Sequence, residues 1–396
     1  MIILKKIFDT PFISNKILTS ALSVFLIAFY LYQDLANWQL MKFIKAQGPI
    51  SYVDSKTVLV YASCFSRIGN EVFDAGNYCA GWAYGSGILR FLNLIGVTQN
   101  NTILIGHIFT YLLVLTFVYY LYLARNFKFA QVVLFLGLIS PSVWLIMERA
   151  NFDTLIYLMV FLSSILFSKN FEALSVFFLF LSATFKFYTL PLLIIPVILS
   201  KRIYIRLFGI GALFLGTIII LADFKLMTGK IVQAGNNHFG MKIIGNYLGK
   251  VDIKLNIFSA YFLGAFLFFG CILLCIFLLQ KFEPLLLEKQ LFLEPVKSIY
   301  IFMSSTFLLC FVAGLSVDYR LIFYLVSAPF LITLLKTNLR LIVSGIFLIG
   351  AWFCYPTGIF QTVGDFALEL VAAFGIIILF LSLFAGKSGS KLNIIA

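Results

Sequence analysis

Long apolar segments follow one another along almost the whole of this chain, and they limit what it can fold into. Hydrophobic residues make up 62% of the sequence and charged residues only 11%, whereas soluble domains carry about 25% charged residues. The sequence therefore predicts an all-α, polytopic membrane protein with about 12 transmembrane or half-length helices, because apolar runs of this length cross or half cross a bilayer. The runs begin near Ile17, Thr102, Phe129, Phe152, Ala173, Leu190, Tyr204, Ile257, Ile299, Leu321, Leu339 and Phe366.

Two long polar stretches, at residues 33–101 and 223–256, interrupt the apolar runs. No water-soluble domain, low-complexity segment or internal repeat accompanies them, so we predict a single integral membrane domain over residues 1–396. The run Ile17–Tyr32 is expected to be an uncleaved first span, because no small-residue cleavage site follows it.

The distribution of basic residues predicts the orientation, because short cytoplasmic loops are rich in Lys and Arg. With the N-terminus inside, the inner turns collect most of these residues, and the short outer turns hold only Arg149, Lys186 and Arg320. We expect a multi-pass protein of the inner (plasma) membrane, with both termini cytoplasmic and both long loops extracytoplasmic. Cys64 and Cys79 both fall in the first long loop, where an oxidising compartment would allow a disulfide.

The segment 173–200 fits neither one upright span nor two full ones, since its length corresponds to about 42 Å of helix. Two prolines interrupt it, and Lys186 lies near its middle. We predict two half-length helices that meet inside the membrane with Lys186 at the bend. An ammonium in an apolar run is costly unless it is paired, so Lys186 is expected to contact a ligand phosphate or a carboxylate such as Glu148 or Asp153.

The hexapeptide Glu148-Arg149-Ala150-Asn151-Phe152-Asp153, named here the 148–153 turn, places three charges and an amide between two apolar runs. These runs are Phe129–Met147 and Thr154–Phe167. Membrane chains retain ionisable groups mainly where they are used. The alternative is a plain charged turn in which Glu148 and Arg149 neutralise each other.

Other candidate residues fall on the same predicted outer side as the 148–153 turn. Each has a simpler explanation: an interfacial aromatic turn around Tyr84, a loop histidine at position 238, or a weak surface pair between Asp318 and Arg320. Their convergence on one face nevertheless favours a ligand site there. Beside the 148–153 turn, the candidates are Asp54, Asp74, Tyr84, Lys186, His238, Asp318, Tyr319 and Arg320.

The chemistry that suits these residue types is sugar transfer from an anionic, lipid-linked donor. Arg and Lys bind phosphate, a carboxylate takes a proton from an acceptor hydroxyl, and Tyr or Trp stacks on sugar rings. The sequence has no Walker loop, dinucleotide fingerprint, zinc motif or nucleophile elbow, so we expect no metal and no cofactor. The basic residues are dispersed rather than interleaved with stacking aromatics, which argues against nucleic acid as a partner.

Three stretches resemble the GT-C glycosyltransferases, in particular the polyprenyl-phosphate-mannose-dependent mannosyltransferases of glycosyltransferase family eighty-seven. They are the stretch from Asp54 to Gly96 with its Tyr84-Gly85-Ser86-Gly87 turn, the 148–153 turn, and Lys186-Phe187-Tyr188-Thr189-Leu190-Pro191; Asp318-Tyr319-Arg320-Leu321 is similar to a late element of that family. The sequence departs from the family pattern at Ala150, where Gly is usual, and at Gly85-Ser86, where Pro is frequent.

The resemblance implies a GT-C-like helical bundle and an inverting transfer to a glycan or glycolipid acceptor on the outer face. The donor would be a polyprenyl-phosphate sugar, mannose-like or another hexose or pentose. The first-loop Asp54 is implied as the catalytic base, with Asp74 as a rival. Arg149, Lys186 and Arg320 would hold the phosphate. The alternatives are a flippase or transporter of lipid-linked saccharides and a polysaccharide polymerase.

Overall fold

The computed structural model describes residues 14–40, 51–73, 85–226, 238–239, 294–312, 316–317, 321–326, 328–333 and 337–353, together with positions 270, 273, 335, 363, 364, 367, 370 and 375. The chain divides into two compact units. Unit 1 comprises Met1–Leu31, Leu115–Val143 and Asn237–Ala396, and unit 2 comprises Tyr32–Val114 and Trp144–Asn236. Each unit is therefore assembled from segments far apart in the sequence, and three of the boundaries, after residues 31, 114 and 143, fall within helices.

Helices form most of the described structure, as the apolar runs predict. The helices in the first half of the chain are α2 (Asn15–Leu35), α3 (Val53–Ile68), η2 (Gly69–Phe73), α4 (Ser86–Leu94), η3 (Gln99–Asn101), α5 (Thr102–Leu123), α6 (Lys128–Leu138), α7 (Pro141–Arg149), α8 (Asp153–Ser168), α9 (Glu172–Phe185) and η4 (Phe187–Leu193). The later elements are α10 (Ile194–Leu199), α11 (Ile203–Leu226), β1 (His238–Phe239), α14 (Glu294–Val312), β2 (Ser316–Val317), α15 (Ile322–Leu325), α16 (Ala328–Thr333) and α17 (Thr337–Phe353).

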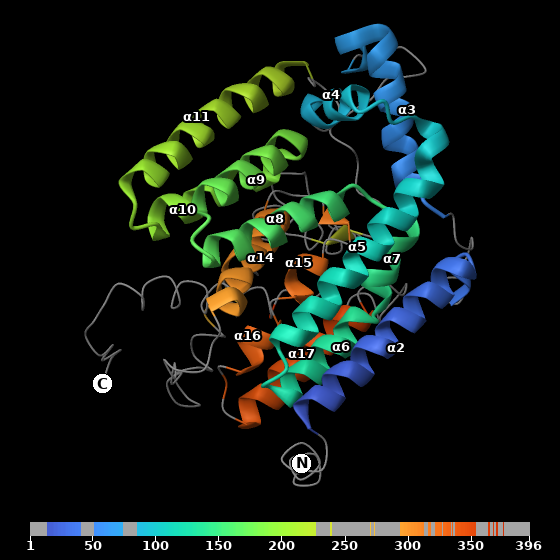
Figure 1. The fold of residues 1–396 in the computed structure, drawn as a ribbon, viewed down its shortest axis with the longest axis vertical. Helices are drawn as coiled ribbons and strands as arrows, with labels where there is room; N and C mark the ends of the chain where they lie inside the picture. The colour runs from blue at the N-terminus through green and yellow to red at the C-terminus, as the bar shows by residue number, and fades with distance from the viewer. Residues whose placement is uncertain are drawn as a thin grey trace, which may run out of the picture. The chain divides into compact units, whose positions relative to one another are not determined.

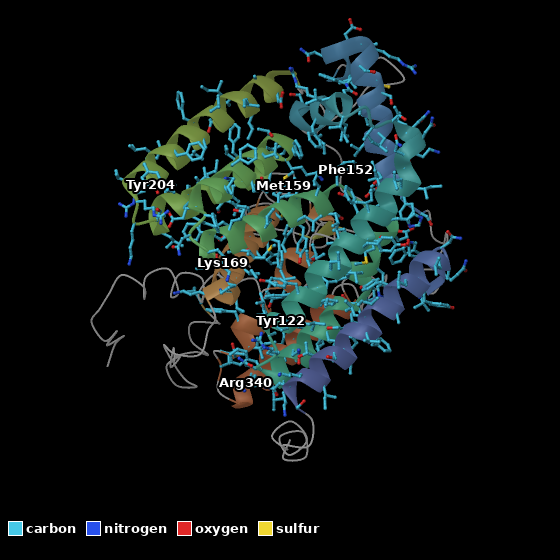
Figure 2. The ribbon with its side chains drawn as sticks, in the orientation of Figure 1. Tyr122, Phe152, Met159, Lys169, Tyr204 and Arg340 are labelled. Carbon is cyan, nitrogen blue, oxygen red and sulfur yellow. The ribbon has the colours of Figure 1, made fainter. Side chains whose placement is uncertain are left out.

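The structure has the character of a helical membrane protein. Among the described residues, three helices are long and apolar enough to cross a membrane: Asn15–Leu35, Gln99–Leu123 and Ile203–Asp223. Large apolar side chains project outward along α11, where Tyr204 is labelled in Figure 2, and 69% of Phe214 and 62% of Leu221 are exposed. An exposed surface of this kind suits contact with lipid rather than water.

The run Phe129–Met147, expected as one segment, is two helices. Helix α6 ends at Leu138, α7 begins at Pro141, and the two are bent by 49°. Proline has no backbone N–H to donate and its ring disfavours a helical residue before it, so the bend follows from Pro141. Counted as one broken span, this pair would raise the number of candidate membrane spans among the described residues to four.

The predicted break at Lys186 is confirmed. Helix α9 ends at Phe185, Lys186 has an extended backbone, and η4 and α10 continue the chain to Leu199. The chain reverses direction at Lys186 and forms a hairpin. At the open end of this hairpin, the Ser200 hydroxyl after α10 donates to the Glu172 carboxylate at the start of α9. Helices α9, α10 and α11 lie side by side in unit 2 (Figure 1).

The turn between α8 and α9 has its own local explanation. Asn170 adopts a left-handed backbone with φ of 64°, and the Phe171 N–H donates to the Leu166 carbonyl across the end of α8. A left-handed residue of this type terminates helices, and Asn tolerates it better than most. The Arg202 guanidinium donates to the Asn170 carbonyl, so the two basic turns predicted to be cytoplasmic contact each other within unit 2.

The stretch 33–101, expected as a loop, contains helices. Helix α2 continues to Leu35, so Asp34 lies in its last turn, and α3 and α4 follow within the stretch. Helix α11 likewise continues past Asp223, the expected start of the second long loop.

Unit 1 is held together around α6. The Gln131 side-chain amide donates to Thr19 of α2 and to the Leu121 carbonyl, at 2.7 and 2.9 Å. The Trp352 indole of α17 donates to the Leu136 carbonyl at 3.1 Å. The strands β1 and β2 form a two-residue antiparallel pair in which His238 lies opposite Val317.

Candidate functional site

The start of α3 is fixed against the 148–153 turn. The Tyr52 N–H donates to the Glu148 carbonyl at 2.6 Å, and the Ser55 hydroxyl donates to the Ala150 carbonyl. Tyr52 and Ala150 both have left-handed backbones, with φ of 61° and 45°. Such strain in residues other than glycine persists only where the surrounding structure imposes it. These backbone conformations and hydrogen bonds hold Asp54, at the start of α3, next to the 148–153 turn.

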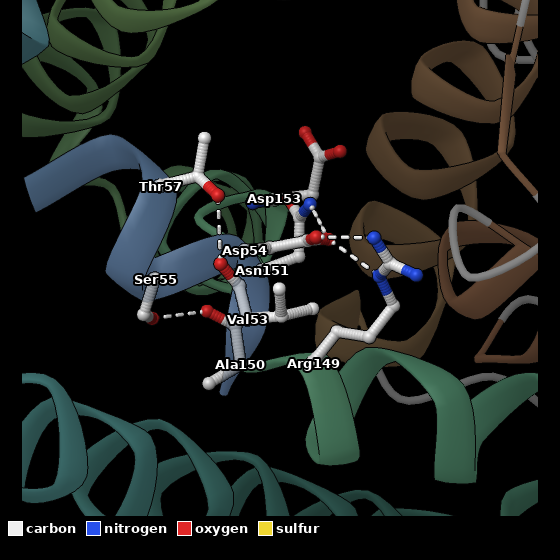
Figure 3. Close-up of polar contacts among 8 residues, drawn as sticks. All are labelled: Val53, Asp54, Ser55, Thr57, Arg149, Ala150, Asn151 and Asp153. Atoms are coloured by element: carbon white, nitrogen blue, oxygen red, sulfur yellow. Dashed lines mark hydrogen bonds and ion pairs between the residues drawn. The ribbon is translucent and has the colours of Figure 1, made fainter. Parts of the chain in front are cut away.

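Asp54 is bound on both of its oxygens by the 148–153 turn (Figure 3). The Arg149 Nε donates to Asp54 Oδ2 at 2.9 Å, and Nη2 donates to Oδ1 at 2.5 Å. The Asn151 amide adds a bond to Oδ2 at 2.6 Å. This two-pronged geometry is the strongest that a guanidinium and a carboxylate form. The alternative was that the neighbouring Glu148 neutralises Arg149. In the structure the carboxylate bound to Arg149 is Asp54, which is 95 residues away in the sequence.

Asn151 connects this pair to a second one. Its side-chain Oδ1 accepts a hydrogen bond from the Asp153 N–H at 2.8 Å. The Asp153 Oδ1 in turn accepts hydrogen bonds from the Lys186 ammonium at 2.8 Å and the Tyr188 hydroxyl at 2.6 Å. The prediction that the Lys186 amine lies within about 4 Å of a carboxylate is therefore confirmed, with Asp153 as that carboxylate. Tyr188, which the sequence analysis did not single out, completes this group.

The two ion pairs differ in their access to solvent. The side chains of Lys186 and Asp153 are 5% and 0% exposed, whereas those of Arg149 and Asp54 are 35% and 15% exposed. A buried pair fixes geometry, because separating it would leave a charge in an apolar environment. A half-exposed guanidinium can also reach an anionic ligand. Lys186–Asp153 is thus the buried pair of the network, and Arg149 is its more exposed cation.

Sequence reasoning missed a third group, formed around Asp34. Its carboxylate accepts the Tyr52 hydroxyl and lies 2.7 Å from His107 Nδ1. Burial raises the pKa of the Tyr52 hydroxyl, and the bond to Asp34 raises it further, so Tyr52 remains a donor over the physiological range. No motif marks these residues in the sequence; the only signal was an ionisable residue at the end of each of two apolar runs.

The Gly85-Ser86-Gly87 turn packs against the end of α9. A Cβ added at Gly85 or Gly87 would lie 2.5 or 2.6 Å from the Thr184 carbonyl oxygen. The Ser86 N–H at the start of α4 donates to Asp223 Oδ2 of α11 at 2.8 Å. A carboxylate at a helix N-terminus is favourable, and this contact joins the two stretches that were predicted to lie outside the membrane.

Several predicted residues lie outside the part of the chain that the structure describes: Asp74, Tyr84, Asp318, Tyr319 and Arg320. His238 is described only by its backbone, which pairs with the residue before Asp318. Cys64 is disulfide-bonded, and its expected partner Cys79 is also outside the described residues. The described residues contain no group of three or more His, Cys, Asp or Glu that could hold a metal ion.

The structure thus brings together Asp54, Arg149, Asn151, Asp153 and Lys186 in one hydrogen-bonded network of unit 2, and Glu148 joins it through its backbone. No family model, no curated protein and no solved structure matches this chain.

Proposed function

We propose that this protein is a membrane glycosyltransferase that moves a sugar from a polyprenyl-phosphate donor to a glycan or glycolipid acceptor. The observation that carries the proposal is the network in unit 2, in which an Arg, an Asn and two carboxylates from two separate segments converge beside a buried Lys from a third. The proposal includes the GT-C-like arrangement of about 12 full or half-length spans that the apolar runs predict.

The arrangement in the membrane forms part of the same proposal. Both termini lie in the cytoplasm of a cell with an inner (plasma) membrane, and the site faces the extracytoplasmic side. Two contacts support the way segments are grouped on each side of the membrane. Ser86 meets Asp223 where two predicted outer stretches adjoin, and Glu172 meets Ser200 where two predicted inner turns adjoin. Each contact joins segments that the basic-residue distribution assigns to one side.

The chemistry of the network suits departure of a lipid phosphate. When the bond between the sugar C1 and the phosphate oxygen breaks, negative charge develops on the phosphate, and a pre-positioned cation lowers the barrier. Arg149 is held in one orientation by Asp54 and remains 35% exposed, so it can present guanidinium N–H groups to that phosphate. Lys186, held by Asp153, adds positive charge behind the turn.

Asp54 contributes to this site in one of two ways. The sequence predicts it as the base that takes the proton from the acceptor hydroxyl, with Asp74 as the rival. The geometry supports a further role, in which Asp54 holds Arg149 in place through both oxygens. Either role makes Asp54 necessary for transfer. Glu148, Asn151 and Asp153 are proposed to shape the sugar pocket or to orient the cations.

The decisive test supplies the purified protein in lipid nanodiscs with a synthetic short-chain polyprenyl-phosphate sugar and, separately, with a polyprenyl-diphosphate oligosaccharide. Release of the polyprenyl phosphate with transfer of one sugar supports the proposal. Use of the diphosphate donor alone would identify a polymerase. Movement of either lipid across the bilayer without cleavage would identify a flippase.

A variant pair ties the activity to the site. Arg149→Lys keeps the charge but removes the two-pronged contact with Asp54, because an ammonium is a point charge without a planar fork. We expect turnover to fall by about 10²-fold, the loss typical of removing one charge-stabilising donor. Arg125→Lys is the matched control, since Arg125 belongs to unit 1, where its guanidinium lies over the Tyr122 ring at 4.1 Å in the turn after α5. Equal activity of the two variants would remove Arg149 from the site.

A further inference from the structure

A histidine–carboxylate pair adjoins the network, and the proposed function does not yet use it. His107, in the second turn of α5, has its Nδ1 2.7 Å from the Oδ2 atom of Asp34 at the end of α2. The Asp34 side chain is fully buried, whereas 37% of the His107 side chain is exposed. Both residues belong to unit 2, as does the 148–153 turn.

The surroundings of His107 fix which ring nitrogen carries the proton. A carboxylate at Nδ1 accepts an N–H, so the neutral ring is protonated at Nδ1 and keeps its lone pair on Nε2. Within the described part of the chain, the hydrogen bonds of His107 all involve Nδ1. Because Nδ1 faces the buried Asp34, Nε2 is the ring nitrogen left for a further contact, on a side chain that is 37% exposed.

The ring is also held from both sides by aromatic groups. Tyr111 stacks on it at 6.1 Å with an interplanar angle of 13°, and Tyr52 meets it edge-on at 5.6 Å. Asp34, Tyr52 and Tyr111 are thus the titratable groups that face His107 among the described residues. A base held in one rotamer and one tautomer in this way is ready for proton transfer without rearrangement.

Tyr52 connects the pair to the candidate site. Its hydroxyl donates to Asp34, its N–H donates to Glu148, and Asp54 follows two residues later. Gly106, next to His107, provides the necessary space, since a Cβ there would lie 2.5 Å from the Tyr52 ring. The left-handed backbone of Tyr52 allows two contacts at once. Its N–H reaches Glu148 in the 148–153 turn, and its hydroxyl reaches Asp34.

We propose that His107, oriented by Asp34, is the proton acceptor of the transfer reaction and that Asp54 positions Arg149. This inference rests on the proposed function and identifies its base. The His107 Nε2 lone pair takes the proton of the acceptor hydroxyl as that oxygen forms a bond to the sugar C1. The bond between C1 and the phosphate oxygen breaks, and its electron pair leaves with the polyprenyl phosphate beside Arg149. The imidazolium that forms is stabilised by Asp34.

His107 suits this role better than Asp54 on geometric grounds. Both Asp54 oxygens accept bonds from Arg149, at 2.9 and 2.5 Å, and Asn151 adds a third bond. A proton arriving on either oxygen would compete with the guanidinium that the reaction needs in place. His107 is a partly exposed side chain whose Nε2 is not the nitrogen bound to Asp34, and the Asp34 carboxylate is already placed to stabilise the imidazolium.

The first experiment measures the dependence of kcat/KM on pH for the wild type, His107→Gln, Asp34→Asn and Asp54→Asn. A histidine base must be neutral to accept a proton, so wild-type activity should fall toward acidic pH. We expect His107→Gln to lose this acidic limb and about 10²–10⁴ of the rate, with the KM for donor unchanged and partial rescue by added imidazole. Asp54→Asn should lose rate but keep the acidic limb.

The second experiment does not depend on activity. Nitrogen-15 NMR of histidine-labelled protein, with the His107 signal assigned by its absence in His107→Gln, reports the tautomer directly. We expect protonation at Nδ1 in the wild type and a mixture of tautomers in Asp34→Asn. A ring protonated at Nε2 in the wild type would overturn the proposal.

These outcomes separate the two proposals. If the wild type transfers sugar and His107→Gln retains both its rate and the acidic limb, His107 is not the base and the glycosyltransferase assignment stands. If the wild type cleaves neither lipid-linked donor, the proposed function fails, and the role of His107 as its base fails with it.

Discussion

Breaking the buried pair between Lys186 and Asp153 should destabilise unit 2 far more than removing both charges together. The Lys186 ammonium lies 2.8 Å from Asp153 Oδ1, and their side chains are 5% and 0% exposed. Lys186→Met removes the cation beside a carboxylate that cannot reach solvent. Removing one partner of a buried pair costs about 3–5 kcal/mol, whereas replacing both is often close to neutral.

The second substitution restores most of the loss. In Asp153→Asn the amide oxygen can still accept the Tyr188 hydroxyl, which lies 2.6 Å from the carboxylate oxygen in the native chain. The double variant Lys186→Met/Asp153→Asn therefore contains no charge at this position and keeps one hydrogen bond. We expect it to be more stable than Lys186→Met alone by about 2 kcal/mol or more, which is within the range of coupling energies for residues in contact.

The assay is reversible unfolding in mixed micelles of increasing SDS content, followed by tryptophan fluorescence for the wild type, both single variants and the double variant. Lys169→Met is the control, because Lys169 is an exposed lysine in the turn between α8 and α9 and such substitutions change stability by about 0.5 kcal/mol or less. If Lys186→Met behaves like Lys169→Met, or if the double variant is as unstable as the sum of the single ones, the ion pair does not hold Lys186 in place.

Three further predictions follow from local geometry and topology. Gly87→Ala places a Cβ 2.6 Å from the Thr184 carbonyl oxygen and should lower the unfolding free energy by about 1–3 kcal/mol. Gly211→Ala, where nothing lies within 4 Å of the added Cβ, should be neutral or stabilising in the same assay. Equal effects of the two substitutions would contradict the close packing of α4 on α9. Ala150→Gly relieves a left-handed backbone with φ of 45° and should change the unfolding free energy by less than about 1 kcal/mol. Ala150→Val introduces a β-branched side chain and should clearly destabilise the protein. If Val is well tolerated, the 148–153 turn is not strained. Single cysteines at positions 54, 238 and 318 should all react with a membrane-impermeant thiol reagent applied from outside the cell. If position 54 is labelled but position 238 or 318 is protected, an odd number of membrane crossings separates the two positions. That result would refute the two half-length helices at Lys186.

Local physical chemistry made the helices predictable from the sequence. Apolar runs near the length of a bilayer form helices because every backbone polar group is then satisfied internally, and the starts of α5, α6, α8, α9 and α11 agree with the predicted ones to within one residue. The reversal at Lys186 was predictable for the same reason, since two prolines and a charge make a continuous apolar helix unfavourable. The bend before Pro141 and the helices inside the stretch 33–101 were missed, because hydropathy over a long window averages out short features.

The sequence also indicated the candidate residues, because charge inside an apolar chain is rare. It could not assign the partners. Arg149 has Glu148 as its neighbour in the sequence but pairs with Asp54, and Lys186 had two candidate carboxylates in the same turn but pairs with Asp153. Only the approach of α3 to the 148–153 turn, fixed by backbone hydrogen bonds from Tyr52 and Ser55, decides the first of these pairs.

The pair of Asp34 and His107 depended entirely on tertiary structure. The two residues are 73 positions apart, each lies near the end of an apolar run, and neither belongs to a motif. By itself the sequence determined where helices form and which ionisable groups they carry, because both depend on short-range preferences and on the cost of charge in lipid. The tertiary structure decided which of those groups meet, because a hydrogen bond requires two atoms within about 3 Å, and that closeness is set by how segments distant in the sequence pack together.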